Sequence, residues 1–439
     1  MTLLAFLFVL GVLIFVHELG HFLAARRHGV RVLTFSLGFG PKIFKVKRGD
    51  TEYCVSAVPL GGYVKMAGEN PDDPRSGQPD EFLSKTKWQR FQILFAGPAM
   101  NIILAIIVLA FVLAQGVPVP AYFDEPAVVG AVVPGSPGEK AGLMRGDQIL
   151  TVAGRRVATW EDLLIAIGIR RPNREVTITL LRGGRTIEAT VVPVAEGRYE
   201  MGSIGVLPDV HPFIDSVIPG DVAIAAGLMK GDVVLSMNGE HIATTGQFRE
   251  VVARNGEREM QIAIRRGDQQ LQMTATPKDR GDGAKLGLYI RDATKSFKPG
   301  PLEAVRLSVE QNIKSSGLIF RTLAGLFTGE TSVRQLQGPV GIAQLSGESA
   351  QEGFIALLSL MAMLSINLGI LNLMPVPVLD GGHILIMALE GIARRDFSMK
   401  VKEKMLLAGF FVLMMLMVTV IYNDLTRVSW IERLMPWRN

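Results

Sequence analysis

Two histidines and a glutamate stand inside an apolar run near the N-terminus, FVLGVLIFVHELGHFLAARRHG at residues 8–29. On a helix, His17 and His21 lie about one turn apart on the same face, so both imidazoles can reach one zinc ion. Glu18 can take a proton from a water that the metal activates. Because a polar side chain at the centre of a membrane helix costs about 2.5 kcal/mol or more, the pattern indicates a Zn²⁺ site.

A catalytic zinc ion keeps three protein ligands and one open position, so a third ligand must come from another segment. We expect this ligand to be Asp380, which lies in NLGILNLMPVPVLDGGHILI. The preceding apolar stretch is interrupted by polar residues and prolines, and such irregular backbone is tolerated at membrane depth only where protein or water satisfies it. Two alternatives stay open: Asp380 as the N-cap of a helix beginning near His383, and His383 as a rival ligand.

The 439-residue chain is 48% hydrophobic, and its apolar residues are unevenly distributed. Four stretches are nearly free of charge and about long enough to cross a 30 Å hydrocarbon layer as helices: 2–25, 91–114, 354–379 and 405–422. His17 would lie about 21 Å along the first span from Leu3, which places the metal in the half of the bilayer near the end of that span. The middle of the chain, 117–300, indicates a water-exposed α/β insert.

The net charge of +5 gathers in short loops beside the apolar runs, which indicates orientation and no nucleic-acid partner. By the positive-inside rule these loops are cytoplasmic, so the metal site lies toward the cytoplasm and the insert lies on the other, outer side of the membrane. A single cysteine, Cys54, excludes an internal disulfide framework. Between the first two spans, β-favouring pieces at 43–48, 51–58 and 62–66 predict a small antiparallel sheet against the membrane helices.

The insert contains an internal repeat with an offset of 85 residues, which starts at Val132 and again at Val217. Both copies run through Pro-Gly, a short helix ending in Ala-Gly-Leu, a Gly-Asp turn, a strand and an amphipathic helix. The pattern resembles the circularly permuted PDZ domains of bacterial envelope proteases. Many PDZ domains add an extended peptide to a sheet edge, but a tandem that only packs and blocks access stays an open alternative.

The metal motifs HELGH and NLMPVPVLDGG, with GFGP, FAGPAMN, GPVGI and the repeats, resemble the site-2 proteases, which are intramembrane zinc metalloproteases. The resemblance covers nearly the whole chain and is greatest with the bacterial branch that regulates sigma-E. It implies that His17, His21 and Asp380 hold zinc and that Glu18 is the general base and acid. It also implies that Asn367, Asn372 and Pro375 line the substrate channel and that Gly61, Gly62, Tyr63 and Val64 pair with the unwound substrate. For the asparagines, polar packing between helices is the alternative.

The fold expected from these features is an α-helical membrane protein with four transmembrane helices, a small membrane-associated β-sheet and an inserted tandem of PDZ domains. The expected domains are transmembrane helices 1 and 2 with the β hairpins at 1–116, a first PDZ domain at 117–200, a second at 201–280, a linker with an amphipathic helix at 281–352, and helices 3 and 4 with the LDG motif at 353–439.

The expected function is hydrolysis of a peptide bond in the transmembrane segment of single-pass membrane proteins, with the PDZ tandem as a size-exclusion gate. The resemblance implies a substrate that is a pre-trimmed anti-sigma factor, in the bacterial inner membrane. A membrane-tethered PDZ adaptor with structural zinc is the alternative, although structural zinc usually has four protein ligands. A metal transporter is a further alternative, but the fourth span supplies no polar position for an ion path.

Overall fold

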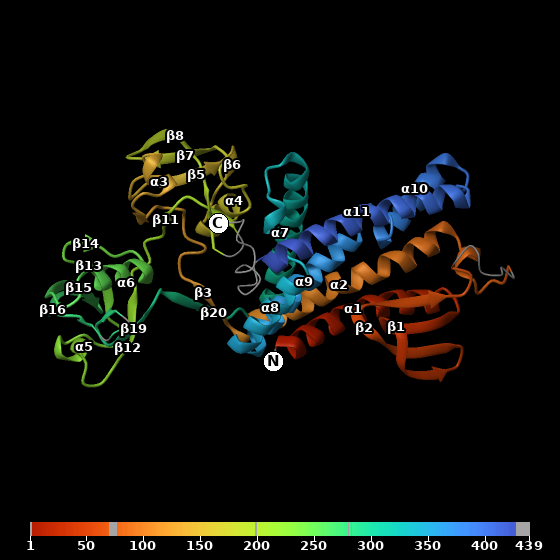
Figure 1. Ribbon diagram of the computed structural model, residues 1–439, viewed down its shortest axis with the longest axis horizontal. Helices are drawn as coiled ribbons and strands as arrows, with labels where there is room; N and C mark the ends of the chain where they lie inside the picture. The colour runs from red at the N-terminus through yellow and green to blue at the C-terminus, as the bar shows by residue number, and fades with distance from the viewer. Residues whose placement is uncertain (1, 70–76, 198–199, 280, 282, 427–439) are drawn as a thin grey trace. The chain divides into compact units, whose positions relative to one another are not determined.

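The computed structural model describes residues 2–69, 77–197, 200–279, 281 and 283–426 (Figure 1). The chain divides into two compact units. The first unit consists of residues 1–116, 298–324 and 336–439, and the second of 117–297 and 325–335.

The first unit is built on long apolar helices. Among the described residues, four helices are long and apolar enough to cross a membrane: α1 (Thr2–Arg27), α2 (Lys87–Gln115), α9 (Phe354–Asn372) and α11 (Met399–Thr426). Figure 1 shows α1, α2 and α9 running side by side, and each of the three contacts the other two. The third helix ends at Asn372 and not at 379, because Pro375 and Pro377 cannot continue the helical hydrogen-bond ladder.

Three further helices complete this unit: α7 (Pro301–Thr328), whose last turn belongs to the second unit, α8 (Pro339–Glu352) and α10 (Asp380–Ala393). The buried Ser308 hydroxyl of α7 donates a hydrogen bond of 2.7 Å to the Ile106 carbonyl of α2. At the start of α8, the backbone N–H groups of Gly338 and Gly341 donate to the buried Asp424 carboxylate of α11, at 3.1 and 2.8 Å. A carboxylate at a helix N-terminus complements the helix dipole, which explains the polar residue just after the fourth apolar run.

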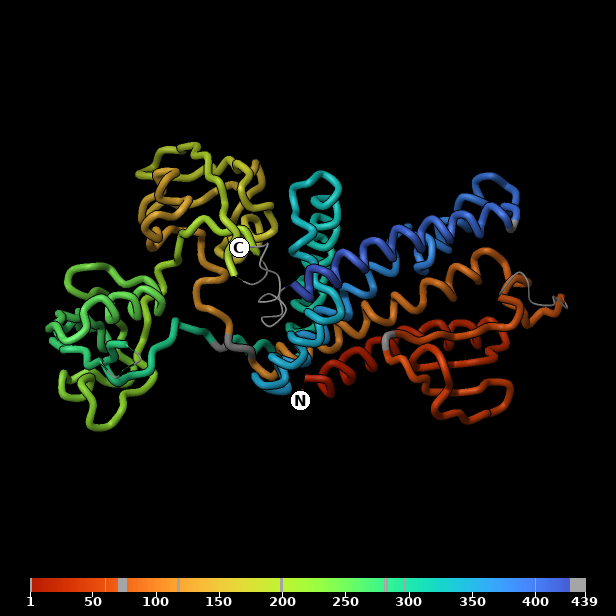
Figure 2. The backbone as a smooth tube through the Cα atoms, viewed as in Figure 1, coloured from red at the N-terminus to blue at the C-terminus, as the bar shows by residue number. Residues whose placement is uncertain are grey.

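Two long, bent strands, β1 (Val32–Arg48) and β2 (Thr51–Met66), form the sheet of the first unit. A short 3₁₀ turn (Phe82–Ser84) leads from this region to α2. Residues 32–37 of β1 pair on one side with 62–66 and on the other with 52–55, while 42–48 pair with 51–56. The predicted pieces at 51–58 and 62–66 are thus one continuous strand, and the prediction missed the pairing segment 32–37. Figure 2 shows this hairpin lying along α1.

The second unit contains the two repeats, each with its own sheet and core. The first repeat has β4 (Ala131–Val132), α3 (Pro137–Lys140), β5 (Gln148–Val152), β6 (Arg155–Arg156), α4 (Trp160–Gly168), β7 (Val176–Arg182), β8 (Arg185–Val191), β9 (Val194–Glu196), β10 (Met201–Ser203) and β11 (Val206–Leu207). Its main sheet has the order β6-β5-β7-β8.

The second repeat follows the same plan with β12 (Phe213–Val217), α5 (Val222–Ala225), β13 (Val233–Met237), β14 (Glu240–His241), α6 (Thr245–Arg254), β15 (Met260–Arg266), β16 (Gln269–Ala275), β17 (Lys278–Asp279), β18 (Ala284–Lys285) and β19 (Leu288–Arg291). Its sheet has the order β16-β15-β13-β12-β19, with β14 beside β13. Strands β3 (Val117–Pro120) and β20 (Thr294–Phe297) pair with each other, and a 3₁₀ turn at Val333–Gln335 also belongs to this unit.

A buried carboxylate holds the Gly-Asp turn in both repeats. Asp147 accepts two hydrogen bonds of 2.7 Å from the Arg182 guanidinium and one of 2.8 Å from the Met144 backbone. Asp232 accepts the equivalent bonds from Arg266 at 2.7 and 2.8 Å. The sequence repeat is therefore a repeat of one hydrogen-bonding arrangement.

Strand pairing places the ends of the repeats later than the expected boundaries. Strand β11 pairs with β4, and Ile204 lies in the first core, so the segment after 200 completes the first repeat. Strand β19 pairs with β12, and Leu286 lies in the second core, so the segment after 280 completes the second. Each repeat recruits a strand that follows its recognisable motif, which the motif alone does not reveal.

Candidate metal centre

The HExxH motif lies in the second half of α1, with His17, Glu18 and His21 turned into the protein. His17, Glu18 and His21 are all buried, with 9%, 8% and 7% of their surface exposed. The neighbouring helix α2 approaches closely because α1 carries Gly20 at this level, where a Cβ would lie only 2.3 Å from the Ala96 carbonyl oxygen. The absence of a side chain at Gly20 therefore lets α2 pack directly against the part of α1 that carries the motif.

Asp380 reaches the same place from the other end of the chain, at the start of α10. Leu379 occupies the N-cap position and Asp380 is the first helical residue, so the N-cap role considered for Asp380 belongs to Leu379. The following glycines let the chain turn back on itself. A Cβ on Gly381 would lie 2.3 Å from the Leu373 carbonyl oxygen, and one on Gly382 would lie 2.2 Å from that of Val376.

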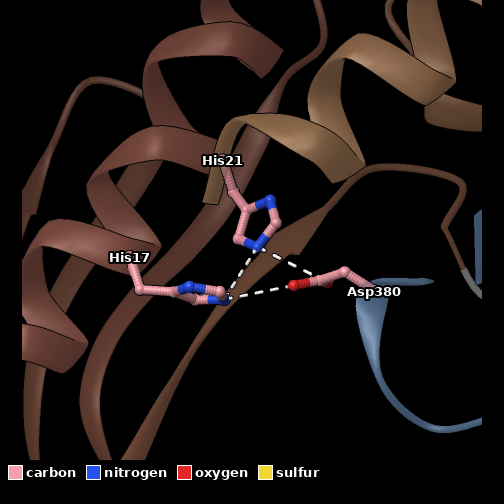
Figure 3. Close-up of side chains that lie close together, drawn as sticks. All are labelled: His17, His21 and Asp380. Carbon is pink, nitrogen blue, oxygen red and sulfur yellow. Dashed lines mark hydrogen bonds and ion pairs between the residues drawn. The ribbon is translucent and has the colours of Figure 1, made fainter. Parts of the chain in front are cut away.

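Figure 3 shows the two imidazoles of α1 and the Asp380 carboxylate converging on one point. The Nε2 atoms of His17 and His21 lie 3.2 Å apart. Asp380 Oδ2 lies 3.2 Å from His17 Nε2, and Asp380 Oδ1 lies 3.5 Å from His21 Nε2. For ligands about 2.0–2.1 Å from zinc in tetrahedral geometry, the donor atoms lie about 3.3 Å apart. The three side chains therefore fit a zinc ion with little rearrangement.

The outer nitrogens of both imidazoles have partners on α2. His21 Nδ1 lies 2.8 Å from the carbonyl oxygen of Ile93, and donation to this oxygen leaves Nε2 free for a metal. His17 Nδ1 lies 3.2 Å from the side-chain amide of Asn101, which is fully buried. Asn101 directs its Nδ2 atom toward the His17 ring, and its Oδ1 atom has no hydrogen-bond partner among the described residues. With the amide turned over, Oδ1 accepts the Nδ1 proton and His17 is oriented as His21 is.

Gly97 is a further residue of α2 on which this site depends. A Cβ at Gly97 would lie 2.2 Å from His21 Nε2, the atom that faces the metal position. Gly97 and Asn101 are four residues apart, on one face of α2. The sequence analysis identified the segment FAGPAMN but gave Gly97 and Asn101 no role. A glycine and an asparagine four residues apart in an apolar helix were the feature that could have indicated one.

A cavity of about 190 Å³ opens beside the three donors. Its lining includes Glu18 and a short stretch of the β2 edge, and consists of His17, Glu18, His21, Gly62, Tyr63, Val64, Met66, Glu69, Leu94 and Asp380. A Cβ on Gly62 would lie 3.0 Å from Glu18 Cγ, so the strand backbone passes directly beside the carboxylate. The cavity offers space for water and substrate next to Glu18.

The other predicted site residues are divided between the cavity and its surroundings. Asn372, the last residue of α9, has its Nδ2 atom 3.4 Å from His17 Nε2. Gly61 faces the Phe39 ring, and neither Gly61, Asn367 nor Pro375 is among the residues lining the cavity. His383 is also outside this lining and does not belong to the group of metal-type donors formed by His17, His21 and Asp380.

Comparison with known proteins places these features in a family. Residues 5–416 match the model of Peptidase family M50. A protein of Vibrio cholerae that is named as a candidate zinc metalloprotease is 32% identical, over 97% of this chain and 98% of its own. The regulator of sigma E protease of Haemophilus influenzae is also 32% identical, over 97% and 98% of the two chains. The protein of that name from Salmonella typhimurium is 31% identical, over 97% and 99%.

A solved structure, the PDZ domain of an SdrC-like protein from Listeria monocytogenes, matches 18% of this chain and 87% of its own at 17% identity, with a TM-score of 0.18. The matched residues include the HExxH motif, Asp380, most of α1, all of α2 and α9, and the first part of α11. The chain belongs to Peptidase family M50.

Proposed function

We propose that this peptidase is an intramembrane zinc metalloprotease that cuts a peptide bond within the transmembrane segment of single-pass membrane proteins. One observation carries the proposal: three zinc-type donors from α1 and α10, the two histidines buried and Asp380 partly buried, lie 3.2, 3.2 and 3.5 Å apart. Two of them belong to a helix apolar enough to span a bilayer. Polar side chains at membrane depth indicate function when they face one another in this way.

In the proposed site His17, His21 and Asp380 hold the ion and Glu18 moves the proton. Zinc, when bound, supplies Lewis-acid chemistry that makes water a stronger nucleophile and polarises a peptide carbonyl. Glu18 accepts a proton from the attacking water and later delivers it to the leaving amide nitrogen. The Asn372 amide, beside His17, donates a hydrogen bond to the substrate carbonyl oxygen as negative charge develops on it.

A substrate helix hides its carbonyl groups in internal hydrogen bonds, so it must unwind before it can react. We propose that the β2 segment of Gly61, Gly62, Tyr63 and Val64 holds the unwound strand by backbone pairing. Residues 62–66 pair on one side with β1, and no described strand pairs with their other side. Three of these residues line the cavity beside Glu18, which supports this role for the free strand edge. Asn367 and Pro375 would then contact the substrate farther along its path.

The repeats of the second unit are proposed to be PDZ domains on the outer side of a bacterial inner membrane. In the first repeat, a groove of about 220 Å³ runs between α4 and the segment 201–206. A helix facing a strand edge is the arrangement by which such domains take extended peptides. We propose that the tandem admits only substrates whose bulky outer domain has been removed, for which a trimmed anti-sigma factor is the model substrate suggested by the sigma-E-regulating relatives.

The catalytic assignment is tested by Glu18→Gln. This change keeps the size of the side chain and removes the proton acceptor, so cleavage of a tagged single-span substrate should fall by at least about 100-fold. Zinc content should stay that of the unaltered protein, since Glu18 is not a ligand. Cleavage at the original rate would reject the role given to Glu18.

The gate is tested separately by deleting residues 127–291 and supplying trimmed and untrimmed substrates side by side. We expect the deletion variant to cut both, whereas the full chain cuts only the trimmed one. Intact untrimmed substrate together with cleaved trimmed substrate would show that the repeats do not exclude by size.

A further inference from the structure

The second unit carries a cluster of metal-type donors that the proposed hydrolysis does not use. Asp209, His211 and His241 each offer one ligand atom, and these atoms all lie within 4.8 Å of one another. Asp209 and His211 lie in the connector between β11 and β12, and His241 ends β14 of the second repeat. Residues that are 32 positions apart in sequence thus meet where the two repeats join.

The two carboxylate oxygens of Asp209 contact different residues. Oδ1 faces both imidazoles, at 2.8 Å from His241 Nε2 and 3.5 Å from His211 Nε2. Oδ2 accepts a hydrogen bond of 3.1 Å from Arg145 Nη2, which belongs to the first repeat. Because the guanidinium occupies only Oδ2, Oδ1 stays available on the side of the imidazoles.

The backbone also fixes the positions of these ligands. His211 Nδ1 lies 2.8 Å from the Ile242 carbonyl oxygen, and donation to this oxygen leaves the Nε2 lone pair directed at Asp209. Metal-binding histidines in proteins almost always have such an outer partner. His211 adopts φ 43°, in the left-handed region that a residue with a side chain rarely takes. Asp209 packs against Gly130, where a Cβ would lie 2.3 Å from the Asp209 nitrogen.

We propose that Asp209, His211 and His241 bind a second divalent transition-metal ion, of which zinc is the representative. Two imidazoles and a carboxylate suit zinc, and tetrahedral coordination separates donors by about 3.3 Å. The 3.5 Å separation already matches, the 2.8 Å separation must open by about 0.5 Å, and the donor atoms of the two histidines lie within 4.8 Å of each other. The three side chains are between 21% and 33% exposed, so an ion can enter from solvent and keep water in its fourth position.

An ion at this site would tie the connector to the second repeat. Asp209 and His211 come from the connector, His241 comes from β14, and Arg145 extends the contact to the first repeat. The bound ion therefore restricts how the repeats turn about residues 208–212. The site is independent of the membrane centre, because the two share no residue.

The test measures the zinc-to-protein ratio of full-length protein after dialysis against buffered zinc. The background is Asp380→Ala, so that zinc at the membrane centre does not contribute. We expect one zinc ion per chain in this background and none when His211→Gln and His241→Gln are added. Asp215→Asn, which alters another carboxylate of the same repeat, is the matched control and should keep the ion.

A second measurement guards against a variant that fails to fold. Asp209→Asn preserves the side-chain shape and its contact with Arg145 but is a poor zinc ligand, so it should bind zinc at least tenfold more weakly. Zinc should slow amide hydrogen exchange at Asp209, Val210 and His211 at least tenfold in the Asp380→Ala protein and not in its Asp209→Asn derivative. Absence of zinc from the Asp380→Ala background, or a ratio unchanged by the histidine substitutions, would overturn the proposal. Absence of zinc from the Asp380→Ala background would leave the assignment of the membrane centre unchanged, because comparison of the unaltered protein with Asp380→Ala tests that assignment separately.

Discussion

The tight contact between Gly97 and His21 makes Gly97→Ala a severe change despite its small size. An alanine Cβ would lie 2.2 Å from His21 Nε2, 2.6 Å from Cε1 and 2.8 Å from Cδ2. Ordinary contact begins at 3.4 Å, so the ring must move by about 1.2 Å (3.4 less 2.2) or the helices must separate by that amount. Zinc–nitrogen bonds tolerate only about 0.2 Å of variation, so the displaced ring cannot remain a ligand.

We expect Gly97→Ala to remove zinc from the membrane centre and to lower cleavage of a single-span substrate by about 100-fold or more, since misplacement by about 1 Å can have this effect. The assay measures zinc content and cleavage rate of the purified protein in the same preparation. Gly11→Ala is the matched control, because a Cβ at Gly11 of α1 meets nothing within 4 Å. It should leave both quantities unchanged.

Gly369→Ala controls for crowding between helices. Its Cβ would press on Ile102 of α2, at 2.9 Å, without touching a proposed ligand. If Gly97→Ala kept its zinc and cut substrate at the original rate, the close approach of α2 to the metal position would be wrong. If Gly369→Ala lost zinc as fully as Gly97→Ala, the loss would reflect general disruption of helix packing.

Two further predictions concern polar groups that support the site and the repeats. Asn101→Ala removes the outer partner of His17 and should weaken zinc binding by about 10–100-fold, measured by competition with a chelator, whereas Asn101→Asp, which keeps an acceptor, should restore most of it. Asp147 has a pKa below its ordinary value of 3.8, because the hydrogen bonds from Arg182 and Met144 outweigh the opposing effect of burial. A carboxylate whose pKa is lower in the folded than in the unfolded state stabilises the fold at pH values above its unfolded-state pKa. This stabilisation is lost as the pH falls toward the folded-state pKa. Asp147→Asn should therefore destabilise the first repeat by about 1–2 kcal/mol at neutral pH, measured by hydrogen exchange at β5 and β7. This loss of stability should become smaller below about pH 4. A loss that grew on acidification would contradict the role given to Asp147.

The long apolar helices and the common face of His17 and His21 could be foreseen because their sequence signals are strong. An apolar run has few alternatives to a membrane span, and the i, i+4 spacing of His17 and His21 predicts a common face on any helix. The position of Asp380 was harder to predict, because Asp380 reaches the two histidines only if the chain turns back after Asn372. The prolines and glycines around it indicate a break and a tight turn without giving the direction of the turn.

Features that arise from packing between distant segments could not be read from the sequence. The roles of Gly97 and Asn101 depend on how α2 lies against α1, and no local pattern encodes that register. Segment 32–37 was missed because its pairing partners, 52–55 and 62–66, are supplied by two halves of one bent strand. The Asp209 cluster likewise depends on a connector whose residues show no periodicity, so only the folded chain brings its histidines together.

The central claim is that Asp380 joins His17 and His21 around one zinc ion within the membrane. The most direct measurement is the zinc content of purified full-length protein compared with that of Asp380→Ala, after both are dialysed against the same buffered zinc. The structure predicts that the variant holds one ion fewer per chain. Equal zinc content in the two proteins would contradict the claim.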